Sequence, residues 1–282
     1  MYTLAVKNDR DEVLNLTENP NYIVYKIEGL NPPKATINSS INATSDGSCI
    51  HSTRTENRNI VIYLTICGDI ERNRLMLYQY FPIKKMVTLY FTNTSKEVLI
   101  RGAVELIECD LFSQRQIAQI SMICPQPYFK AVEELIISFG DVVERFEFPF
   151  SIPASGMEFS SIVASQRKTI LNTGDEEIGV LIELFALGTV VHPVIYDVDT
   201  RGSMRLNLTM QVGDRIRINT NVGEKEITLI RDGESFNAIG YMAVTSEWFQ
   251  LQSGDNVFSY DADSGRSSLQ KTFATSPLYS GV

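Results

Sequence analysis

The chain has 282 residues, of which 44% are hydrophobic and 21% are charged, and this length predicts about two domains. The composition excludes a disordered chain, a collagen-like repeat and a disulfide-dense miniprotein. The net charge is −9, yet residues 1–130 carry 14 basic and 13 acidic side chains, whereas residues 131–282 carry 11 and 21. Neither half clusters its basic side chains, no apolar run reaches the ~18 residues of a membrane span, and no signal peptide is visible. We therefore expect a soluble chain, made in a cytoplasm, that binds neither nucleic acid nor membrane.

Alternating and β-branched patterns dominate the first half of the chain. They predict strands at residues 22–28, 59–66, 86–91, 97–108 and 115–123. One helix is predicted over residues 70–81, because Asp69 can cap its N-terminus and Pro82 blocks its continuation. Ile70, Leu77 and Phe81 would share the buried face of this helix. A weaker pattern predicts a second, short helix at residues 127–137.

A domain junction is predicted between residues 125 and 150, where the charge shifts and two prolines flank Gln126. Beyond it, strands separated by glycine-containing turns are predicted at residues 145–150, 178–185, 189–198, 203–210, 215–220, 226–230 and 248–251. Many short strands at this spacing predict sandwiches or barrels, so the chain is expected to be mainly β. Residues 262–282 are small and polar, and we expect them to be loosely ordered.

The cysteine and histidine content offers little for catalysis. The four cysteines show no CxxC spacing, so we expect reduced thiols, most of them buried. Cys49 and His51 would share one face of a strand, which alone does not make a catalytic dyad. His192 lies in a β-branched segment and is expected to be an ordinary strand residue.

Two Asp-x-Asp pairs, Asp197 with Asp199 and Asp261 with Asp263, could offer oxygen ligands to Ca²⁺. The glycine and distal glutamate of an EF-hand loop are missing, so solvated acidic turns are the favoured interpretation. No P-loop, Rossmann fingerprint, HExxH or GxSxG motif is present, and no carboxylate pair is singled out for glycoside hydrolysis. We therefore assign no catalytic, metal-binding or cofactor-binding residue.

Trp248 and Phe249 form an aromatic pair in a β context. An exposed tryptophan above a concave sheet could stack on a sugar, whereas a buried one would fill the core. We favour the core position, and the sugar platform remains the alternative.

The order of segments in the first half resembles the distal tail (Dit-like) family of siphophages, the long-tailed phages with non-contractile tails. The segments are a strand opening at Arg58 and Asn59, a helix with Tyr78, Gly102 before a closing strand, and the stretch Pro127, Tyr128 and Phe129. This last stretch is the most specific, although Gln126 stands where an aspartate is expected. The second half resembles the galectin-like C-terminal sandwich of the same family, through Gly213, Trp248 and Asn256.

The resemblance implies two domains and a structural role. Residues 1–135 would form a β-sandwich-like, ring-forming domain with one helix, and residues 136–282 a galectin-like β-sandwich. The ten residues just named from Arg58 to Asn256 would be fold markers rather than ligands.

In this interpretation the chain is a phage or prophage virion protein, made in the bacterial cytoplasm and located at the tail tip. Six copies would form a ring that connects the tail tube protein to the hub or tip protein and to a receptor-binding protein. No reaction and no cofactor is expected. The alternatives are a carbohydrate-binding module of a host-adhesion device and a β-sandwich enzyme acting on glycosides.

Overall fold

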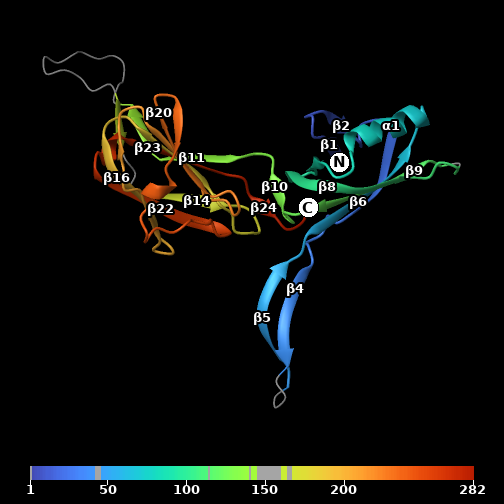
Figure 1. Cartoon of the computed structure of the whole chain (residues 1–282), viewed down its shortest axis with the longest axis horizontal. Coiled ribbons are helices and arrows are strands. Elements are labelled where there is room, and N and C mark those ends of the chain that lie inside the picture. Colours follow the sequence, from blue (N-terminus) through green and yellow to red (C-terminus); the bar gives the residue numbers. More distant parts are fainter. Residues whose placement is uncertain (1, 42–45, 114, 140, 145–159, 164–166) are drawn as a thin grey trace. The chain divides into compact units, whose positions relative to one another are not determined.

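The computed structural model describes residues 2–41, 46–113, 115–139, 141–144, 160–163 and 167–282. The chain forms two compact units (Figure 1). Unit 1 contains Met1–Glu133 and Leu278–Val282, and unit 2 contains Glu134–Pro277. The end of the chain therefore belongs to unit 1, whereas the sequence-based division placed it in the second domain.

A nine-stranded antiparallel sheet is the framework of unit 1. Its main path runs in the order β2-β1-β7-β8-β9-β6-β3, and β10 pairs with β8 and β24. The strands are β1 (Thr3–Lys7), β2 (Val13–Asn15), β3 (Tyr22–Glu28), β6 (Arg58–Ile66), β7 (Met86–Thr92), β8 (Glu97–Cys109), β9 (Ile117–Cys124), β10 (Phe129–Ala131) and β24 (Leu278–Tyr279). Buried residues alternate with more exposed ones along the longer strands, so one sheet face carries the core.

The predicted helix is α1 (Ile70–Tyr80), and the Asp69 side chain accepts a hydrogen bond from the backbone of Arg72 at its start. Leu77 and Phe81 are fully buried as expected. Ile70, however, is 40% exposed, and the inward position is taken by Asn73. The Asn73 amide donates to the Cys67 carbonyl at 2.7 Å. A buried polar residue of this kind, which fixes the start of α1, cannot be predicted from the spacing of apolar residues.

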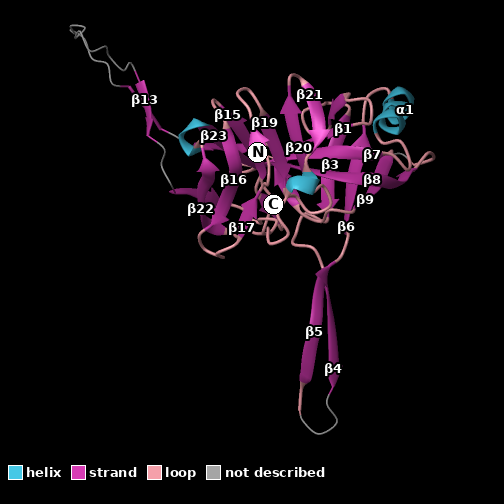
Figure 2. Ribbon diagram, turned by 60° about the vertical axis from the view of Figure 1, so that its left-hand side comes forward, coloured by secondary structure: helices cyan, strands magenta, loops and turns pink. Residues whose placement is uncertain are grey.

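Strands β4 (Ala35–Ile41) and β5 (Ser48–Thr55) form a separate two-stranded sheet within unit 1. This hairpin extends away from the sheet at the start of β6 (Figures 1 and 2). Nearly all of its described residues are exposed on both faces. The predicted strands do not include this hairpin, although Cys49 and His51 were considered as part of a strand, because the segment is rich in Ser, Thr and Asn.

Unit 2 contains two larger antiparallel sheets. The six-stranded sheet has the order β11-β23-β15-β19-β20-β21, and the five-stranded sheet has the order β14-β22-β16-β17, with β18 also paired to β16. The strands are β11 (Leu135–Phe139), β14 (Arg167–Asn172), β15 (Leu181–Ala186), β16 (Val190–Asp197), β17 (Ser203–Arg205), β18 (Thr209–Met210), β19 (Arg215–Asn219), β20 (Glu226–Arg231), β21 (Glu234–Asn237), β22 (Gly254–Ser264) and β23 (Leu269–Thr275). The Phe258 ring from β22 lies 5.4 Å from that of Phe273 on β23, which joins the two sheets through the core.

Smaller elements complete unit 2. Strands β12 (Asp141–Glu144) and β13 (Ser160–Val163) pair with each other, and the short 3-10 helices are η1 (Ile239–Tyr241) and η2 (Arg266–Ser268). Across the described residues, no helix is both long and apolar enough to cross a bilayer. The mainly β architecture predicted from the sequence is confirmed.

Several local predictions are wrong or lie outside the described residues. The short helix expected at 127–137 is replaced by strands β10 and β11, and residues 248–251 contain only an isolated bridge between Leu251 and Ile178. Residues 262–282 are not loosely ordered, since β22, β23 and β24 occupy most of them. Of the four free cysteines only Cys124 is buried, and Cys49 is exposed. The strand expected at 145–150 falls outside the described residues.

Candidate functional site

The acidic pairs considered as metal ligands take part in hydrogen bonds of the fold. The Asp197 carboxylate accepts hydrogen bonds from the backbone of Asp199 and Thr200, which closes a turn. Asp263 accepts from His192 at 2.7 Å and from Arg205 at 2.5 Å, and both bonds lower the pKa of its carboxyl group. In the part of the chain that the structure describes, no group of three or more His, Cys, Asp or Glu side chains could hold a metal ion.

His51 lies on the hairpin and does not form a catalytic pair with Cys49. Its Nε2 atom is 2.6 Å from the hydroxyl oxygen of Ser40 on the facing strand. A break in the register between β4 and β5 falls beside His51. The side chain therefore contributes to the pairing of the two strands.

Trp248 is half-buried and lies in a segment without regular structure, after η1. The Lys225 amine lies 5.6 Å from the centre of its ring. Phe249 is buried and packs edge-on against Phe258. The two neighbouring aromatic residues therefore have different environments. Phe249 fills the core, and Trp248 is neither fully buried nor an open platform on a sheet.

Arg58 is 3% exposed, and its guanidinium donates hydrogen bonds to four backbone carbonyl oxygens. Two of these acceptors, Gly29 and Asn31, precede the hairpin. The other two are Pro127, at 2.5 Å from Nε, and Ser280 near the chain end, at 2.6 Å from Nη2. Burial lowers the pKa of Arg58, but a guanidinium keeps its proton under any ordinary condition.

The neighbours of Arg58 extend this arrangement, which we call the Arg58 junction. The guanidinium carbon lies 4.5 Å from the centre of the Phe129 ring, which is itself buried. The Tyr128 hydroxyl is 3.0 Å from that of Thr55 at the end of the hairpin. One cation thus fixes the base of the hairpin, the last residues of the chain and the segment that leaves unit 1. Four predicted fold markers, Arg58 and residues 127–129, meet here.

The remaining markers of unit 1 act elsewhere. Asn59 accepts a hydrogen bond from Ser121 at 3.0 Å across the sheet. Gly102 is buried where an added Cβ atom would lie 2.6 Å from the Met122 methyl carbon, so the packing of β8 on β9 excludes a side chain. Tyr78 is 37% exposed on α1, and burial is the main cause of its raised pKa.

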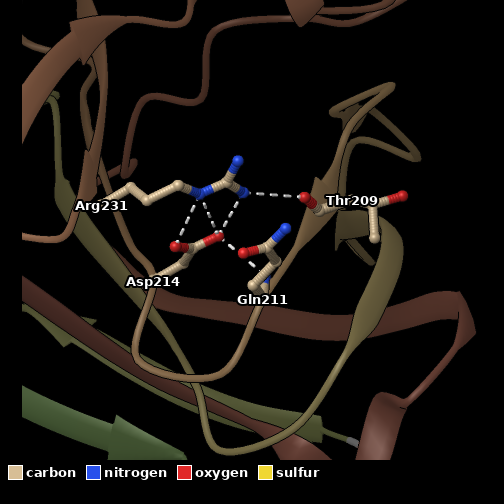
Figure 3. Close-up of polar contacts among 4 residues, drawn as sticks. All are labelled: Thr209, Gln211, Asp214 and Arg231. Atoms are coloured by element: carbon tan, nitrogen blue, oxygen red, sulfur yellow. Dashed lines mark hydrogen bonds and ion pairs between the residues drawn. The ribbon is translucent and has the colours of Figure 1, made fainter.

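In unit 2, Gly213 has a φ of +89° in a turn that precedes β19, a conformation that favours glycine. This turn is held by an ion pair that the sequence analysis missed (Figure 3). The buried Asp214 carboxylate accepts from Arg231 Nε at 2.9 Å and Nη2 at 2.5 Å, and from the Gln211 backbone at 2.7 Å. The Arg231 guanidinium holds the pKa of Asp214 below its usual range. In the sequence, the feature that could have pointed to this ion pair is the aspartate directly after the turn glycine.

Asn256, the last marker, is 5% exposed near the start of β22. Its side-chain oxygen accepts from the Gln252 backbone at 2.8 Å, and its amide donates to the Gln252 and Gly254 carbonyls at 2.8 and 2.9 Å. Both ends of the side-chain amide are therefore used to close one turn. At this position the side chain serves the fold.

One face of the hairpin carries three exposed isoleucines. Ile37, Ile41 and Ile50 are 57%, 83% and 63% exposed. Ile50 pairs with Ser39, which places it on the same face as the two β4 isoleucines. We call this surface the isoleucine face. The opposite face is polar, with the Asn38 amide donating to Ser52 at 2.9 Å.

Residues 173–274 match the family model described as siphovirus-type tail component, C-terminal domain. The matched residues lie within unit 2. The predicted resemblance to Dit-like tail proteins is thereby confirmed, and no curated protein sequence matches the chain.

Solved structures share the fold over the whole chain. SPP1 Dit (gp 19.1), described as a paradigm of the hub adsorption apparatus in phages that infect Gram-positive bacteria, has a TM-score of 0.71 at 12% identity, with 99% of both chains covered. Chains of the phage P2 baseplate in its activated conformation have a TM-score of 0.56. The Ca structure is 13% identical and covers 100% of both chains, and the Sr structure is 14% identical and covers 97% of this chain and 98% of that one. At these identities the shared property is the Dit fold.

Proposed function

We propose that this chain is a structural component of a siphovirus tail tip, in the position of a distal tail protein. The tail-component domain in unit 2 and the Dit fold of the whole chain support this role. The relatives with this fold are parts of a hub adsorption apparatus and of baseplates. The same role places the protein in the virion tail, at its distal end.

Within this role we propose that six copies form a ring through unit 1. The observation that carries this proposal is the isoleucine face, whose three large apolar side chains are more than half exposed. A two-stranded hairpin is marginal on its own in water and needs a further layer to pack against. Assembly supplies such a layer, and a closed ring supplies it to every copy.

The ring would connect the tail tube protein to the hub or tip protein, and a receptor-binding protein is a further partner. Unit 2 belongs to the more acidic part of the chain, where residues 131–282 carry 11 basic and 21 acidic side chains. We infer that this charge keeps the assembled particle soluble. In this role the protein acts by holding its neighbours in place and catalyses no reaction.

The two alternative functions gain no support from the described side chains. Trp248 lies outside the strands with Lys225 over its ring, and the acidic side chains considered as ligands are engaged in turns and ion pairs. We therefore retain the structural role alone.

The experiment that tests this proposal is the mass of the purified full chain, measured by light scattering over a concentration series. A ring of six chains of 31.7 kDa has a mass of about 190 kDa. We expect this species to appear as the concentration rises, or when the tail tube protein is added. A monomer at every concentration, alone and with the tail tube protein, would contradict the ring.

A further inference from the structure

We propose that residues Leu278–Val282, which we call the returning segment, fix the direction of the unit 1 hairpin and so make assembly depend on residues that follow unit 2 in the chain. The returning segment belongs to unit 1, although all of unit 2 separates it from Glu133 in the sequence. The inference rests on the proposed ring, because the hairpin carries the apolar surface that assembly would cover.

The returning segment packs beside residues 30–32, which lead into β4. The backbone nitrogen of Val282 donates to the Leu30 carbonyl at 3.2 Å. A Cβ atom added to Gly281 would lie 3.0 Å from the Cδ atom of Pro32 and 3.4 Å from the Leu30 carbonyl oxygen, so the two backbones leave little room for a side chain between them. In Figure 1 the mark C lies beside the point where the hairpin leaves unit 1. One side of the hairpin base therefore rests on the returning segment.

Arg58 joins the same two segments. Its Nη2 atom donates to the Ser280 carbonyl at 2.6 Å, and its Nη1 atom donates to the Asn31 carbonyl at 2.7 Å. The returning segment is in turn held by the sheet, because β24 pairs with β10 and the Tyr279 ring lies 3.9 Å from the Lys96 amine. It thus connects the sheet of unit 1 to the base of the hairpin.

The direction of the hairpin is set at this base. In the described part of the chain, β4 and β5 pair with each other and with no third strand. Strand β4 has seven residues, so it is about 23 Å long at ~3.3 Å per residue, and a rotation of about 10° at its base moves its far end by about 4 Å. That displacement is as large as the distance between two carbon atoms in contact. A hairpin without a fixed base therefore cannot keep its isoleucine face against one partner surface.

The order of the chain gives this dependence a consequence for assembly. Domains fold as units, beginning with the N-terminal one during synthesis. When Glu133 has been made, the sheet of unit 1 still lacks β24, and Arg58 still lacks the Ser280 carbonyl. All of unit 2 must follow before the returning segment can bind. A chain in which unit 2 is incomplete thus holds its hairpin in no fixed direction and is excluded from the ring.

The direction of the hairpin can be measured as the distance between two spin labels in the full chain. One label is attached to Cys49, the exposed cysteine on β5, and the other to Arg101→Cys, at an exposed position of β8. Cys67→Ser and Cys109→Ser remove the two partly exposed thiols, and Cys124 is buried and stays. Double electron–electron resonance, at a concentration where the chain is monomeric, should give one narrow distance distribution.

Gly281→Val tests the contact with the hairpin base. This variant keeps β24 and the Ser280 carbonyl but presses a side chain against Pro32. We expect the distance distribution to become about twofold wider or more, because the hairpin base must shift to make room. Light scattering should show that the concentration needed for assembly rises by about tenfold or more. Val282→Pro, which removes the N–H bonded to Leu30, should act in the same direction.

The matched control is Gly240→Val in unit 2, because a Cβ atom added there meets no atom within 4 Å. Its distance distribution and its assembly should match those of the natural chain. Hydrogen exchange of the β8 and β9 amides checks that the sheet is intact, and in Gly281→Val these rates should stay within about twofold of the natural ones.

The outcomes separate this inference from the ring itself. If Gly281→Val and Val282→Pro kept the natural distance distribution, or assembled at the natural concentration despite a wider one, the role of the returning segment would be overturned and the ring would stand. If the natural chain stayed monomeric at every concentration, alone and with the tail tube protein, the ring and the dependence of assembly would both be overturned.

Discussion

At the scale of single residues, Arg58 joins segments of unit 1 that lie far apart in the sequence. Its guanidinium holds four carbonyl oxygens and packs on Phe129. We predict that Arg58→Met lowers the free energy of unfolding of unit 1 by about 3–5 kcal/mol, because buried acceptors lose a charged donor. Urea unfolding followed by far-UV circular dichroism measures the change. Arg54→Met is the same change at an exposed position of β5, and it should alter the free energy of unfolding by less than ~0.5 kcal/mol. Equal unfolding midpoints for the two variants would show that the Arg58 junction is not a stabilising centre.

The buried amine of Lys271 makes the free energy of unfolding of unit 2 depend on pH. It lies on the core side of β23, 3% exposed, with its amine 3.0 Å from the centre of the Tyr260 ring. Burial, and to a lesser extent the charge of Arg266, lowers the pKa of Lys271 from 10.5 to about 7. The unfolded chain holds this proton up to a higher pH than the folded chain. The free energy of unfolding therefore rises as the pH rises from about 7 to 10.5, and the full cost of the buried charge applies below about 7.

Lys271→Met should remove this dependence. We expect the variant to be about 2–4 kcal/mol more stable than the natural chain at pH 7, with the difference shrinking towards pH 10. Urea unfolding at several pH values, followed by Trp248 fluorescence, measures it. Gln270→Met adds a methionine to the exposed side of the same strand and keeps the amine, so its pH profile should match the natural chain. Parallel profiles for the natural chain and Lys271→Met would show that the amine stays charged in the fold.

At the scale of elements, the start of β22 depends on the chemistry of the Asn256 amide. Asn256→Asp keeps the shape but turns the donor towards the Gln252 and Gly254 carbonyls into an acceptor. We predict a loss of about 1–3 kcal/mol in the unfolding free energy of unit 2. Asn237→Asp is the matched control, because the side-chain oxygen of Asn237 accepts from the Ile239 backbone and its amide nitrogen has no partner among the described residues. A similar, small loss in both variants would show that the turn does not depend on the amide donor.

The burial of an element decides whether it could be predicted from the sequence. Strand β3 has the bounds predicted for it, and β6, β7 and β8 differ by about one residue at an end. One face of each packs on the core, and this burial requires the apolar and β-branched residues from which the strands were predicted. The hairpin was absent from the predicted strands, since neither of its faces is buried in a single chain. Strand β23 was missed because Lys271 occupies a core position and breaks its apolar period.

The candidate site was less visible than the strands for a related reason. The resemblance identified Arg58 as a marker, but its acceptors are backbone carbonyls of residues far apart in sequence, among them Gly29 and Ser280. A backbone oxygen carries no residue-type signal, so the Arg58 junction emerges only from the folded chain. The isoleucine face was hidden in the same way, because its three members share a face only through the pairing of β4 with β5.

At the scale of the whole molecule, the chain passes twice between its two units, after Glu133 and before Leu278. The returning segment is short but has several contacts within unit 1. Tyr279 pairs with Phe129, its ring lies 3.9 Å from the Lys96 amine, and Ser280 is an acceptor of Arg58. The stability of the N-terminal unit therefore depends on the last residues of the chain.

A chain that stops after Pro277 tests this dependence. It keeps all of unit 2 and removes only residues 278–282, so the loss should fall on unit 1 alone. The single tryptophan, Trp248, lies in unit 2, so its fluorescence reports that unit while circular dichroism reports both. We predict an unchanged fluorescence transition and an earlier component in circular dichroism, equivalent to about 2–4 kcal/mol. Tyr279→Phe, which keeps the strand pairing and the ring, should cost much less than the truncation. If the truncation instead shifted the fluorescence transition, the segment would be stabilising unit 2, contrary to its contacts with Phe129, Lys96 and Arg58.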